Sequence, residues 1–390
     1  MSQSPISLPE PDADARAHSA RLSAVIRERI NAAGGWLNFA DYMRAALYEP
    51  GLGYYSAGAH KFGESGDFVT APEISPLFSR CVASQCAQVL GATGGDTVLE
   101  LGAGTGRMAA DMLLEFERLG QLPTRYCVLE TSADLRARQR ATLASLPDEL
   151  AGRVSWLERL PDKPIQGVIL GNEVVDALPV QRFIAERGAV FELGVTLEDG
   201  RFADAMRPAD AELEAFVAGL HVGDDGAYSS ERNPQLKAWL AGLGDALETG
   251  VVMLFDYGFS AREYYLPERR SGTLRCYYRH RAHEDPYFWP GLQDITAWVD
   301  FTALAEAAPS ANLSVSGYTT QAQFLLAAGI EAQVANASAK GPQQQVELAS
   351  GLRKLMLPGE MGDAIKVMGL TRGDAVLPNG FSGRDMRSSL

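Results

Sequence analysis

A glycine-rich turn preceded by an acid is the part of the sequence whose residue types point most directly to chemistry. Residues 98–107 read VLELGAGTGR, which places Gly102, Gly104 and Gly106 in a G-x-G-x-G pattern after Glu100. Glycines let the backbone approach a ligand closely at the beginning of a helix. A dinucleotide fold instead uses G-x-G-x-x-G to hold a pyrophosphate. Because Glu100 would repel a diphosphate, the turn favours a cationic ligand.

A second acid, Glu130, stands where a carboxylate can bind a ribose. It ends the next apolar run, 24 residues after Gly106, and a carboxylate there can accept both ribose hydroxyls. The turn and Glu130 together resemble the class I S-adenosyl-L-methionine (SAM) methyltransferases, whose cofactor carries a sulfonium and an ammonium and no phosphate. The resemblance implies that the turn surrounds the methionine part of SAM, and that Leu157 and Glu158 flank the adenine. The alternative is a tight turn beside acids that face solvent.

A pair of acids follows the fourth predicted strand. Residues 171–179 read GNEVVDALP, at the carboxyl edge of the sheet, where doubly wound folds bind ligands. We expect Asn172, at the end of the strand, on the cofactor side. If the segment is helical, Glu173 and Asp176 lie on one face and can converge on one group. Two carboxylates suit a guanidinium, which offers five donors in a rigid fork.

The same two acids could perform chemistry on an arginine. A guanidinium, with a pKa above about 12, has no free lone pair to attack a methyl group. Carboxylates that draw the positive charge onto the other nitrogens would leave one terminal nitrogen nucleophilic and in line with the sulfonium. Glu173 or Asp176 could then accept the proton as a general base, a contribution of roughly 10²- to 10⁴-fold. The alternative is that one of these acids caps a following helix.

The composition excludes several classes of protein. The 390 residues carry 35 Lys and Arg against 49 Asp and Glu, a net charge of −14, which argues against a general electrostatic grip on nucleic acid or an anionic membrane. The four cysteines are too few for a disulfide scaffold and too widely spaced for a C-x-x-C metal site. No run approaches the roughly 18 apolar residues that a membrane span needs. With a leader unlike a signal or transit peptide, we expect a cytoplasmic protein without metal.

The hydrophobic pattern predicts the elements that position these residues. Short apolar runs alternate with helical patterns over 97–170 and again over 234–257, which predicts a parallel sheet with crossover helices. Between them, two or three alternating strands around Glu198-Asp199-Gly200 indicate an antiparallel insertion at about 181–206. The tail adds helices and two more strands.

Two helix starts are predicted from capping patterns. Thr70 and Glu73 fit a capping box that opens a helix to about Leu90. Asp294 could cap a helix that ends near Ala307.

Further blocks make the family resemblance narrower. They resemble the MidA family, SAM-dependent methyltransferases related to the mitochondrial complex I assembly factor that dimethylates an arginine. The match covers about Phe39 to Met368 and includes the blocks 66–75 (GDFVTAPEIS), 172–179 (NEVVDALP), 256–258 (DYG), 272–275 (GTLR) with His280, 290–296 (PGLQDIT) with 299–301 (VDF), and 361–362 (MG) with 366–367 (KV).

The resemblance implies roles for residues outside the glycine turn. It implies that residues 66–75 fold over the cofactor, so that the pocket is lined by Asp67, Phe68, Thr70 and Glu73, although a capping box is a rival for the last two. Asp256 and Tyr257 end the fifth core strand and are expected to contact the substrate. His280, in an aromatic and basic segment, is expected there too, with a structural histidine as its alternative.

The sequence therefore predicts an α/β fold, a Rossmann-like class I methyltransferase sheet with an N-terminal helical segment and an antiparallel β insertion. We predict a disordered leader (1–18), a helical segment with the loop that covers the cofactor (19–93), and the core (94–390). The predicted activity is SAM-dependent methylation of an arginine in a protein substrate, with a NADH dehydrogenase subunit as the first substrate to test. The alternatives are an assembly or scaffold protein that binds SAM without turnover, or methylation of another nucleophile.

Overall fold

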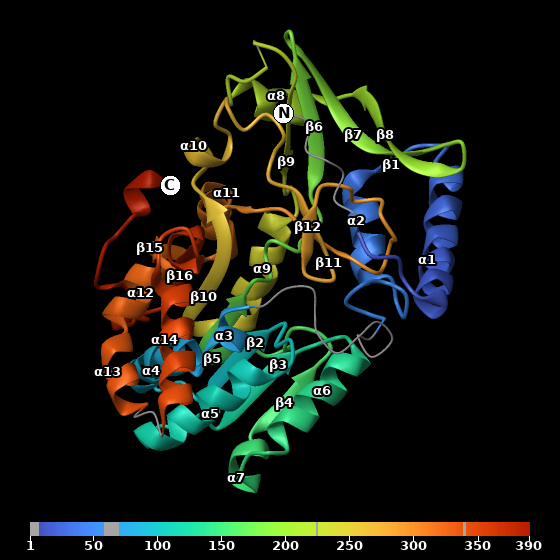
Figure 1. The fold of residues 1–390 in the computed structure, drawn as a ribbon. Coiled ribbons are helices and arrows are strands. Elements are labelled where there is room, and N and C mark those ends of the chain that lie inside the picture. Colours follow the sequence, from blue (N-terminus) through green and yellow to red (C-terminus); the bar gives the residue numbers. More distant parts are fainter. Residues whose placement is uncertain (1–7, 58–69, 224, 338–340) are drawn as a thin grey trace. The chain divides into compact units, whose positions relative to one another are not determined.

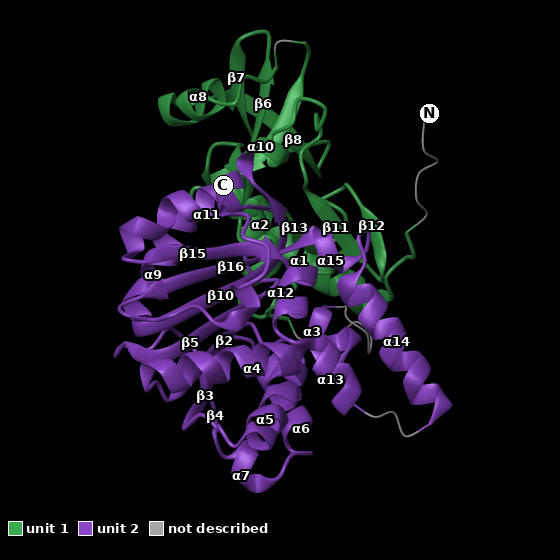
Figure 2. Cartoon of the chain, turned by 90° about the vertical axis from the view of Figure 1, so that its left-hand side faces the viewer, with its two compact units in different colours: residues 1–68, 176–235, 262–298 green, residues 69–175, 236–261, 299–390 purple. Residues whose placement is uncertain are grey.

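The computed structural model describes residues 8–57, 70–223, 225–337 and 341–390, and it divides the chain into two compact units (Figure 1; Figure 2). Unit 2 is formed by Val69–Val175, Leu236–Ala261 and Val299–Leu390. Unit 1 is formed by Met1–Phe68, Asp176–Gln235 and Arg262–Trp298. The predicted insertion at about 181–206 is therefore only one part of a larger unit that also contains the N-terminal helices.

Unit 2 contains an eight-stranded sheet with a parallel centre. Its order is β15-β16-β10-β5-β2-β3-β4, with β14 also paired to β10, and β16 runs antiparallel to both of its neighbours. This arrangement confirms the predicted parallel sheet with crossover helices. The strands are β2 (Thr97–Leu101), β3 (Arg125–Leu129), β4 (Val154–Leu157), β5 (Ile165–Asn172), β10 (Leu247–Phe259), β14 (Val299–Asp300), β15 (Ser314–Thr320) and β16 (Ile365–Arg372).

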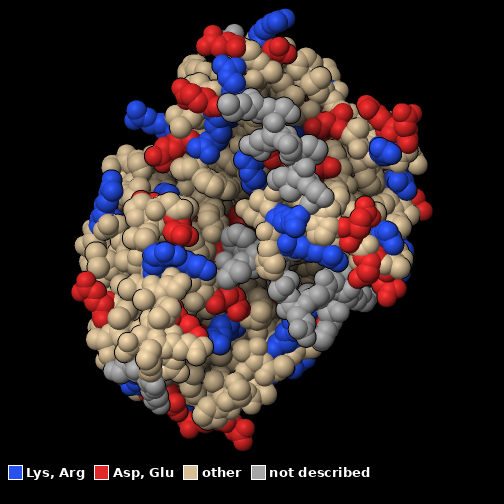
Figure 3. Space-filling model, in the orientation of Figure 1, with Lys and Arg blue, Asp and Glu red and all other residues tan. Residues whose placement is uncertain are grey.

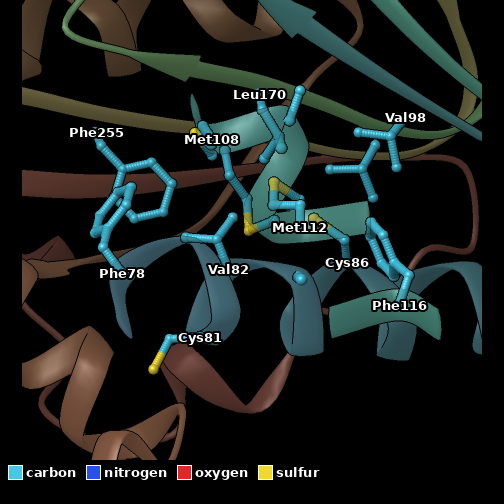
Figure 4. Close-up of a cluster of buried hydrophobic side chains, with 14 of the residues drawn as sticks. Phe78, Cys81, Val82, Cys86, Val98, Met108, Met112, Phe116, Leu170 and Phe255 are labelled. Atoms are coloured by element: carbon cyan, nitrogen blue, oxygen red, sulfur yellow. The ribbon is translucent and has the colours of Figure 1, made fainter. Parts of the chain in front are cut away.

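Helices cover both faces of this sheet. α4 (Pro76–Thr93) and α9 (Leu236–Ala246) both pack on β10, and residues 251–256 of this strand are fully buried. A continuous buried run is typical of a strand that is covered on both faces. Figure 4 shows the core on the α4 side, where the packed side chains include Phe78, Val82 and Cys86 of α4, Met108, Met112 and Phe116 of α5 (Arg107–Leu119), and Phe255 of β10.

The other helices of unit 2 are short except for α6 and α14. They are α3 (Ala71–Ile74), α6 (Ala133–Leu143), α7 (Asp148–Ala151), α11 (Phe301–Ala307), α12 (Gln321–Ala327), α13 (Ile330–Asn336), α14 (Pro342–Met356) and α15 (Met361–Ala364), with 3₁₀ turns η2 (Ala308–Ala311), η3 (Asn379–Phe381) and η4 (Arg387–Ser389).

The helix predicted from residue 70 to about 90 is divided in two. α3 ends after one turn, and Ser75 begins α4 by accepting a hydrogen bond from the backbone N–H of Leu77 (3.3 Å). The Thr70 side chain makes no capping hydrogen bond to α3. The capping-box interpretation of Thr70 and Glu73 is therefore wrong, because Ser75 is the residue that caps the long helix.

Unit 1 contains two antiparallel sheets and the N-terminal helices. The larger sheet has the order β1-β7-β6-β9, with β8 also paired to β7, and the smaller one has the order β12-β11-β13. The turn between β7 and β8, with Asp199 (φ 49°) and Gly200 (φ 75°), confirms the predicted hairpin. The elements are β1 (Leu37–Asn38), α2 (Phe39–Tyr48), β6 (Gln181–Glu186), β7 (Ala189–Glu198), β8 (Arg201–Pro208), α8 (Ala211–Ala218), β9 (Tyr228–Arg232), β11 (Arg275–Tyr278), β12 (Arg281–His283) and β13 (Asp294–Thr296), with α10 (Ala261–Tyr264) at a boundary between the units.

Two further boundaries differ from the prediction. Helix α1 (Ala13–Ala32) begins within the predicted leader of residues 1–18, because the Asp12 carboxylate accepts a hydrogen bond from Ala15 N (2.8 Å) and caps the helix. The predicted cap at Asp294 is also wrong, since Asp294 lies in strand β13. The nearby helix α11 is capped instead by Asp300.

None of the helices in the described ranges has both the length and the hydrophobicity required to cross a bilayer. Within the same ranges, no group of three or more His, Cys, Asp and Glu side chains is arranged to hold a metal ion. On the face drawn in Figure 3, acidic and basic side chains of the described residues are interspersed.

Candidate functional site

The glycine turn connects β2 to α5 at the carboxyl edge of the unit 2 sheet. Gly102, Gly104 and Gly106 all have positive φ values, of 62°, 52° and 83°. A Cβ atom at Gly106 would lie 3.0 Å from the Cα atom of Gln139, so this glycine lets α5 and α6 pack closely. At Gly104 nothing lies within 4 Å of the Cβ position. The turn therefore has open space at Gly104, where a ligand can approach the backbone.

Glu130 follows β3 beside this turn, as the sequence predicts. Its carboxylate is buried, and it accepts hydrogen bonds from Ser132 N to Oε1 (2.9 Å) and from Gln139 Nε2 to Oε2 (3.2 Å). Burial raises the pKa of Glu130, and these hydrogen bonds oppose that rise. Because a carboxylate offers about four lone-pair sites, these donors and the backbone of Thr131, which also interacts with Glu130, leave capacity for a ribose hydroxyl.

Gln139 is a site residue that sequence reasoning missed. It is fully buried on α6, and its Nε2 group donates to the carbonyl of Gly104 (3.0 Å) as well as to Glu130. Its Oε1 atom accepts a hydrogen bond from Trp156 Nε1 on β4 (2.8 Å). The Gln139 amide thus connects the glycine turn, Glu130 and strand β4. The sequence signal was slight, a single uncharged amide within the arginine-rich run RARQR.

Glu100 and Glu158 have contrasting surroundings. Glu100 is buried in β2, where Tyr126 O–H donates to its Oε2 atom (2.7 Å), and burial raises its pKa to about 7. Glu158 is largely exposed after β4 and pairs with Arg136 (2.8 Å). The carbonyl of Leu157 accepts a hydrogen bond from Glu130 N (3.0 Å), so these two residues are neighbours. The contacts of these three residues with a cofactor stay predictions.

Residues 173–175 follow β5 next to the glycine turn, and we call them the Glu173 turn. A Cβ atom at Gly102 would lie 3.3 Å from Cγ1 of Val174, so the two turns are in contact. The residues after β5 form turns and bends rather than a helix. The segment is therefore not helical, so the alternative in which Glu173 or Asp176 caps a following helix is wrong.

Glu173 itself is held in a strained conformation. Its φ of 53° is a left-handed value that few residues other than glycine adopt. Its Oε1 atom accepts hydrogen bonds from Asn172 Nδ2 (3.1 Å) and from the backbone N–H of Ala71 at the start of α3 (3.4 Å). Asn172 also has a buried Oδ1 atom that receives no hydrogen bond from the described residues. This acceptor suits an ammonium group.

Residues around α3 also reach the glycine turn. Glu73 is exposed, and its carboxylate accepts a hydrogen bond from the hydroxyl of Thr105, inside the turn. Thr70 immediately precedes α3. The predicted pocket residues Asp67 and Phe68 lie outside the described residues.

The two residues expected to end the fifth core strand, Asp256 and Tyr257, lie within β10, which continues to Phe259, and they differ in exposure. Asp256 is fully buried, and its carboxylate accepts hydrogen bonds from backbone N–H groups of the Glu173 turn. Tyr257 follows it and is half-buried. The contact of Tyr257 with a substrate stays a prediction.

Two predicted residues belong to unit 1. Asp176 is buried, and its carbonyl accepts a hydrogen bond from Ala297 N (3.0 Å). His280 is exposed in the hairpin between β11 and β12 and has a positive φ of 60°. The convergence of Glu173 and Asp176 on one group, and the substrate contact of His280, stay predictions.

Unit 1 also holds a group of tyrosines and acids that sequence reasoning did not assemble. Tyr55 O–H donates to Asp294 Oδ1 (2.8 Å), and Tyr48 O–H donates to the carbonyl of Ala177 (2.9 Å). Burial raises the pKa of Tyr55, and the negative charge of Asp294 raises it further. The Tyr54-Tyr55 pair was visible in the sequence, but 239 residues separate Tyr55 from Asp294.

The arrangement in unit 2 defines a class of protein. A glycine turn with open space, a buried acid with spare acceptor capacity and an amide oxygen unpaired among the described residues fit SAM, and these groups belong to Gly104, Glu130 and Asn172. Together with the sheet order, they define a class I SAM-dependent methyltransferase.

Comparison with known proteins gives the family. The chain matches Methyltransf_28, a family of S-adenosyl-L-methionine-dependent methyltransferases, over residues 81–319, and it belongs to this family. It is similar to the mitochondrial protein arginine methyltransferase NDUFAF7 of Rattus norvegicus, with 30% identity over 84% of this chain and 79% of that protein. It is also similar to the NDUFAF7 homolog of Drosophila melanogaster, with 28% identity over 93% and 88% of the two chains.

A solved structure supports the fold and the cofactor. A protein from Burkholderia thailandensis, bound to S-adenosyl-homocysteine, is 44% identical and superimposes with a TM-score of 0.94 over 98% of this chain and 100% of that one. The class I fold, the MidA-like family and the cofactor SAM are thereby confirmed. The protein is a SAM-dependent methyltransferase.

Proposed function

We propose that this methyltransferase transfers methyl groups from SAM to arginine side chains of a protein substrate. The observation that carries the proposal is the position of Glu173, a carboxylate held by Asn172 and Ala71 on a turn that touches the glycine turn. A methylated guanidinium must lose a proton, and an acid beside the cofactor turn can accept it. The relatives that are named protein arginine methyltransferases support this choice of nucleophile.

The proposed mechanism assigns the guanidinium to Glu173 and Asp176, its proton to Glu173, and the cofactor to other residues. SAM supplies an electrophilic methyl group on a sulfonium. Glu173 and Asp176 would draw the guanidinium charge away from one terminal nitrogen, and Glu173 would accept the proton of that nitrogen as the nitrogen bonds to the methyl carbon. The bond between that carbon and the sulfur of SAM would break, with S-adenosyl-homocysteine as the leaving group. On the substrate side we place Tyr257 and His280. The residues proposed for the cofactor are Glu100, Gly102, Gly104, Gly106, Glu130, Leu157, Glu158, Asn172, Asp67, Phe68, Thr70 and Glu73.

The substrate and the cellular location are further parts of the proposal. The MidA resemblance makes a NADH dehydrogenase subunit the first substrate to test. The expected cytoplasmic location stays a prediction, and the curated relatives are named as mitochondrial proteins.

Transfer of a labelled methyl group tests the proposal. The protein is incubated with SAM labelled in its methyl group and with a lysate, and the labelled protein fraction is hydrolysed to amino acids. We expect the label in methylated arginine, and we expect protease but not nuclease treatment to release it. Label in lysine, in nucleic acid or in small molecules would contradict arginine as the target. Binding of S-adenosyl-homocysteine without any transfer would support the scaffold alternative instead.

Purified NADH dehydrogenase subunits test the narrower substrate proposal. We expect one of them to accept label at an arginine, and mass spectrometry identifies the position. Label in other lysate proteins but in none of these subunits would contradict the narrower proposal and leave arginine methylation standing.

A further inference from the structure

Three consecutive backbone N–H groups of the Glu173 turn end on one neighbouring strand. The N–H of Glu173 donates to the carbonyl of Phe255 (2.8 Å). The N–H groups of Val174 and Val175 both donate to Oδ2 of Asp256, at 3.1 and 2.8 Å. The first of these bonds continues the pairing of β5 with β10, in which Asn172 lies opposite Phe255. The other two bonds both depend on the side chain of Asp256.

The Asp256 carboxylate is built into the fold at this point. Its side chain is fully buried at the end of β10, and its Oδ1 atom accepts a hydrogen bond from the backbone N–H of Tyr257 (2.9 Å). Hydrogen bonds to an ionised acceptor are roughly twice as strong as neutral ones. A buried carboxylate that accepts three backbone donors fixes the backbone on both strands that it joins.

The turn that Asp256 holds is the strained one. A left-handed φ at a residue other than glycine persists only when surrounding bonds enforce it, and Glu173 has a φ of 53°. The side-chain contacts of Glu173 with Asn172 and Ala71 fix its carboxylate, but they do not fix the backbone that follows it. The bonds from Val174 and Val175 to Asp256 do so.

We propose that Asp256 is a positioning residue for Glu173, which acts on the reaction through the backbone of the turn and does not touch the substrate. This inference rests on the proposed role of Glu173, and it replaces the substrate contact that the family resemblance implied for Asp256. It predicts that Asp256 affects the rate of methyl transfer only as long as Glu173 is present.

A double-mutant cycle tests this dependence, with single-turnover methyl transfer as the readout. Asp256→Asn is expected to lower the rate by about 10- to 100-fold, because a misplacement of about 1 Å can cost 10²-fold. The affinity for S-adenosyl-homocysteine is expected to change by less than about 3-fold, because its proposed contacts lie elsewhere. In a Glu173→Gln background, Asp256→Asn is expected to cause no further loss.

Asp300→Asn is the matched control. Its carboxylate also accepts two backbone N–H groups, from Thr302 (3.0 Å) and Ala303 (3.1 Å), but at the start of α11. We expect this variant to keep most of its thermal stability, because Asn caps a helix about as well as Asp does. Its methyl transfer rate is expected to stay within about 2-fold, because changes away from a site usually have small effects.

Some results would overturn the role of Asp256, and others would contradict the proposed function. An unchanged rate in Asp256→Asn, or losses that multiply in the double variant, would overturn it, the latter because Asp256 would then act independently of Glu173. Asp256→Glu is measured alongside in case the asparagine variant does not fold. It keeps the charge but displaces the turn, and the same loss and the same dependence on Glu173 are expected. A wild-type protein without methyl transfer, or a fully active Glu173→Gln, would contradict the proposed function itself.

Discussion

The Glu130 and Glu173 turns are two solutions to placing an acid after a strand of the same sheet. Glu130 has an ordinary backbone, and its hydrogen bonds come from nearby residues, Ser132 and Gln139. Glu173 has a left-handed backbone, and it is held by residues far away in the sequence, such as Ala71. A left-handed φ at a residue other than glycine persists only where surrounding bonds enforce it. Under the proposed function, the turn with Glu130, the relaxed turn, binds the cofactor, and the turn with Glu173, the strained turn, holds the base for the chemistry.

The largest expected effect comes from removing the acid of the strained turn. Glu173→Gln keeps an oxygen that can accept from Ala71 but loses the ability to take a proton. We expect methyl transfer to fall by roughly 10²- to 10⁴-fold, the usual contribution of a general base. Calorimetry with S-adenosyl-homocysteine is expected to give an affinity within about 3-fold of wild type. An equal loss of affinity and rate would show that the two turns do not divide binding and chemistry between them.

The complementary change removes the acid of the relaxed turn. Glu130→Ala is expected to weaken S-adenosyl-homocysteine binding by about 10- to 100-fold, because hydrogen bonds to a charged group contribute about 1.5–3 kcal/mol. The rate at saturating SAM is expected to stay within a few-fold of wild type, which distinguishes this variant from Glu173→Gln. Unchanged binding would remove Glu130 from the proposed cofactor site.

The sequence predicted the relaxed turn far better than the strained one. The glycine pattern, Glu130 and the strands around them are local signals, and the structure places them together. The conformation of Glu173 instead depends on contacts with Ala71, 102 residues away, and on Asp256, which lies 82 residues from Val174. The sequence left open whether this segment is helical, because spacing alone could not reveal these long-range bonds. The size of unit 1 was missed for a similar reason, since its three segments are distant in the sequence.

A third acid, Glu100, tests whether a charge next to the relaxed turn costs stability. Its folded-state pKa of about 7 lies above its usual 4.5. As pH rises from about 4.5 to 7, the unfolded state releases the proton first, so stability falls over this window and is constant above it. Glu100→Gln removes the titrating carboxyl group and so avoids this loss of stability. We expect it to raise the free energy of unfolding at pH 8 by up to about 3 kcal/mol, from a shift of about 2.5 units at 1.36 kcal/mol each.

Urea denaturation at pH 5 and pH 8 measures this effect. At pH 5 the variant is expected to be more stable by less than about 1 kcal/mol, because Glu100 is protonated in the folded protein and the unfolded state is only at the start of this pH window. A pH-independent difference would show that the carboxyl group is not the cause. If the stabilised variant also binds SAM more weakly, and S-adenosyl-homocysteine less so, then the charge of Glu100 serves the cationic cofactor at the expense of stability.

The smallest effect is expected at Glu158, the exposed acid that the family resemblance places beside the adenine. Its side chain is 73% exposed and pairs with Arg136, and exposed ion pairs contribute about 0–1 kcal/mol. Glu158→Gln is therefore expected to change the free energy of unfolding by less than about 1 kcal/mol and S-adenosyl-homocysteine affinity by less than about 3-fold. Arg136→Gln is the matched variant for the same pair. Suppose that Glu158→Gln weakens binding of S-adenosyl-homocysteine more than about 10-fold and Arg136→Gln does not. Glu158 must then contact the cofactor instead of Arg136, and the cofactor-binding surface extends from Glu130 to Glu158.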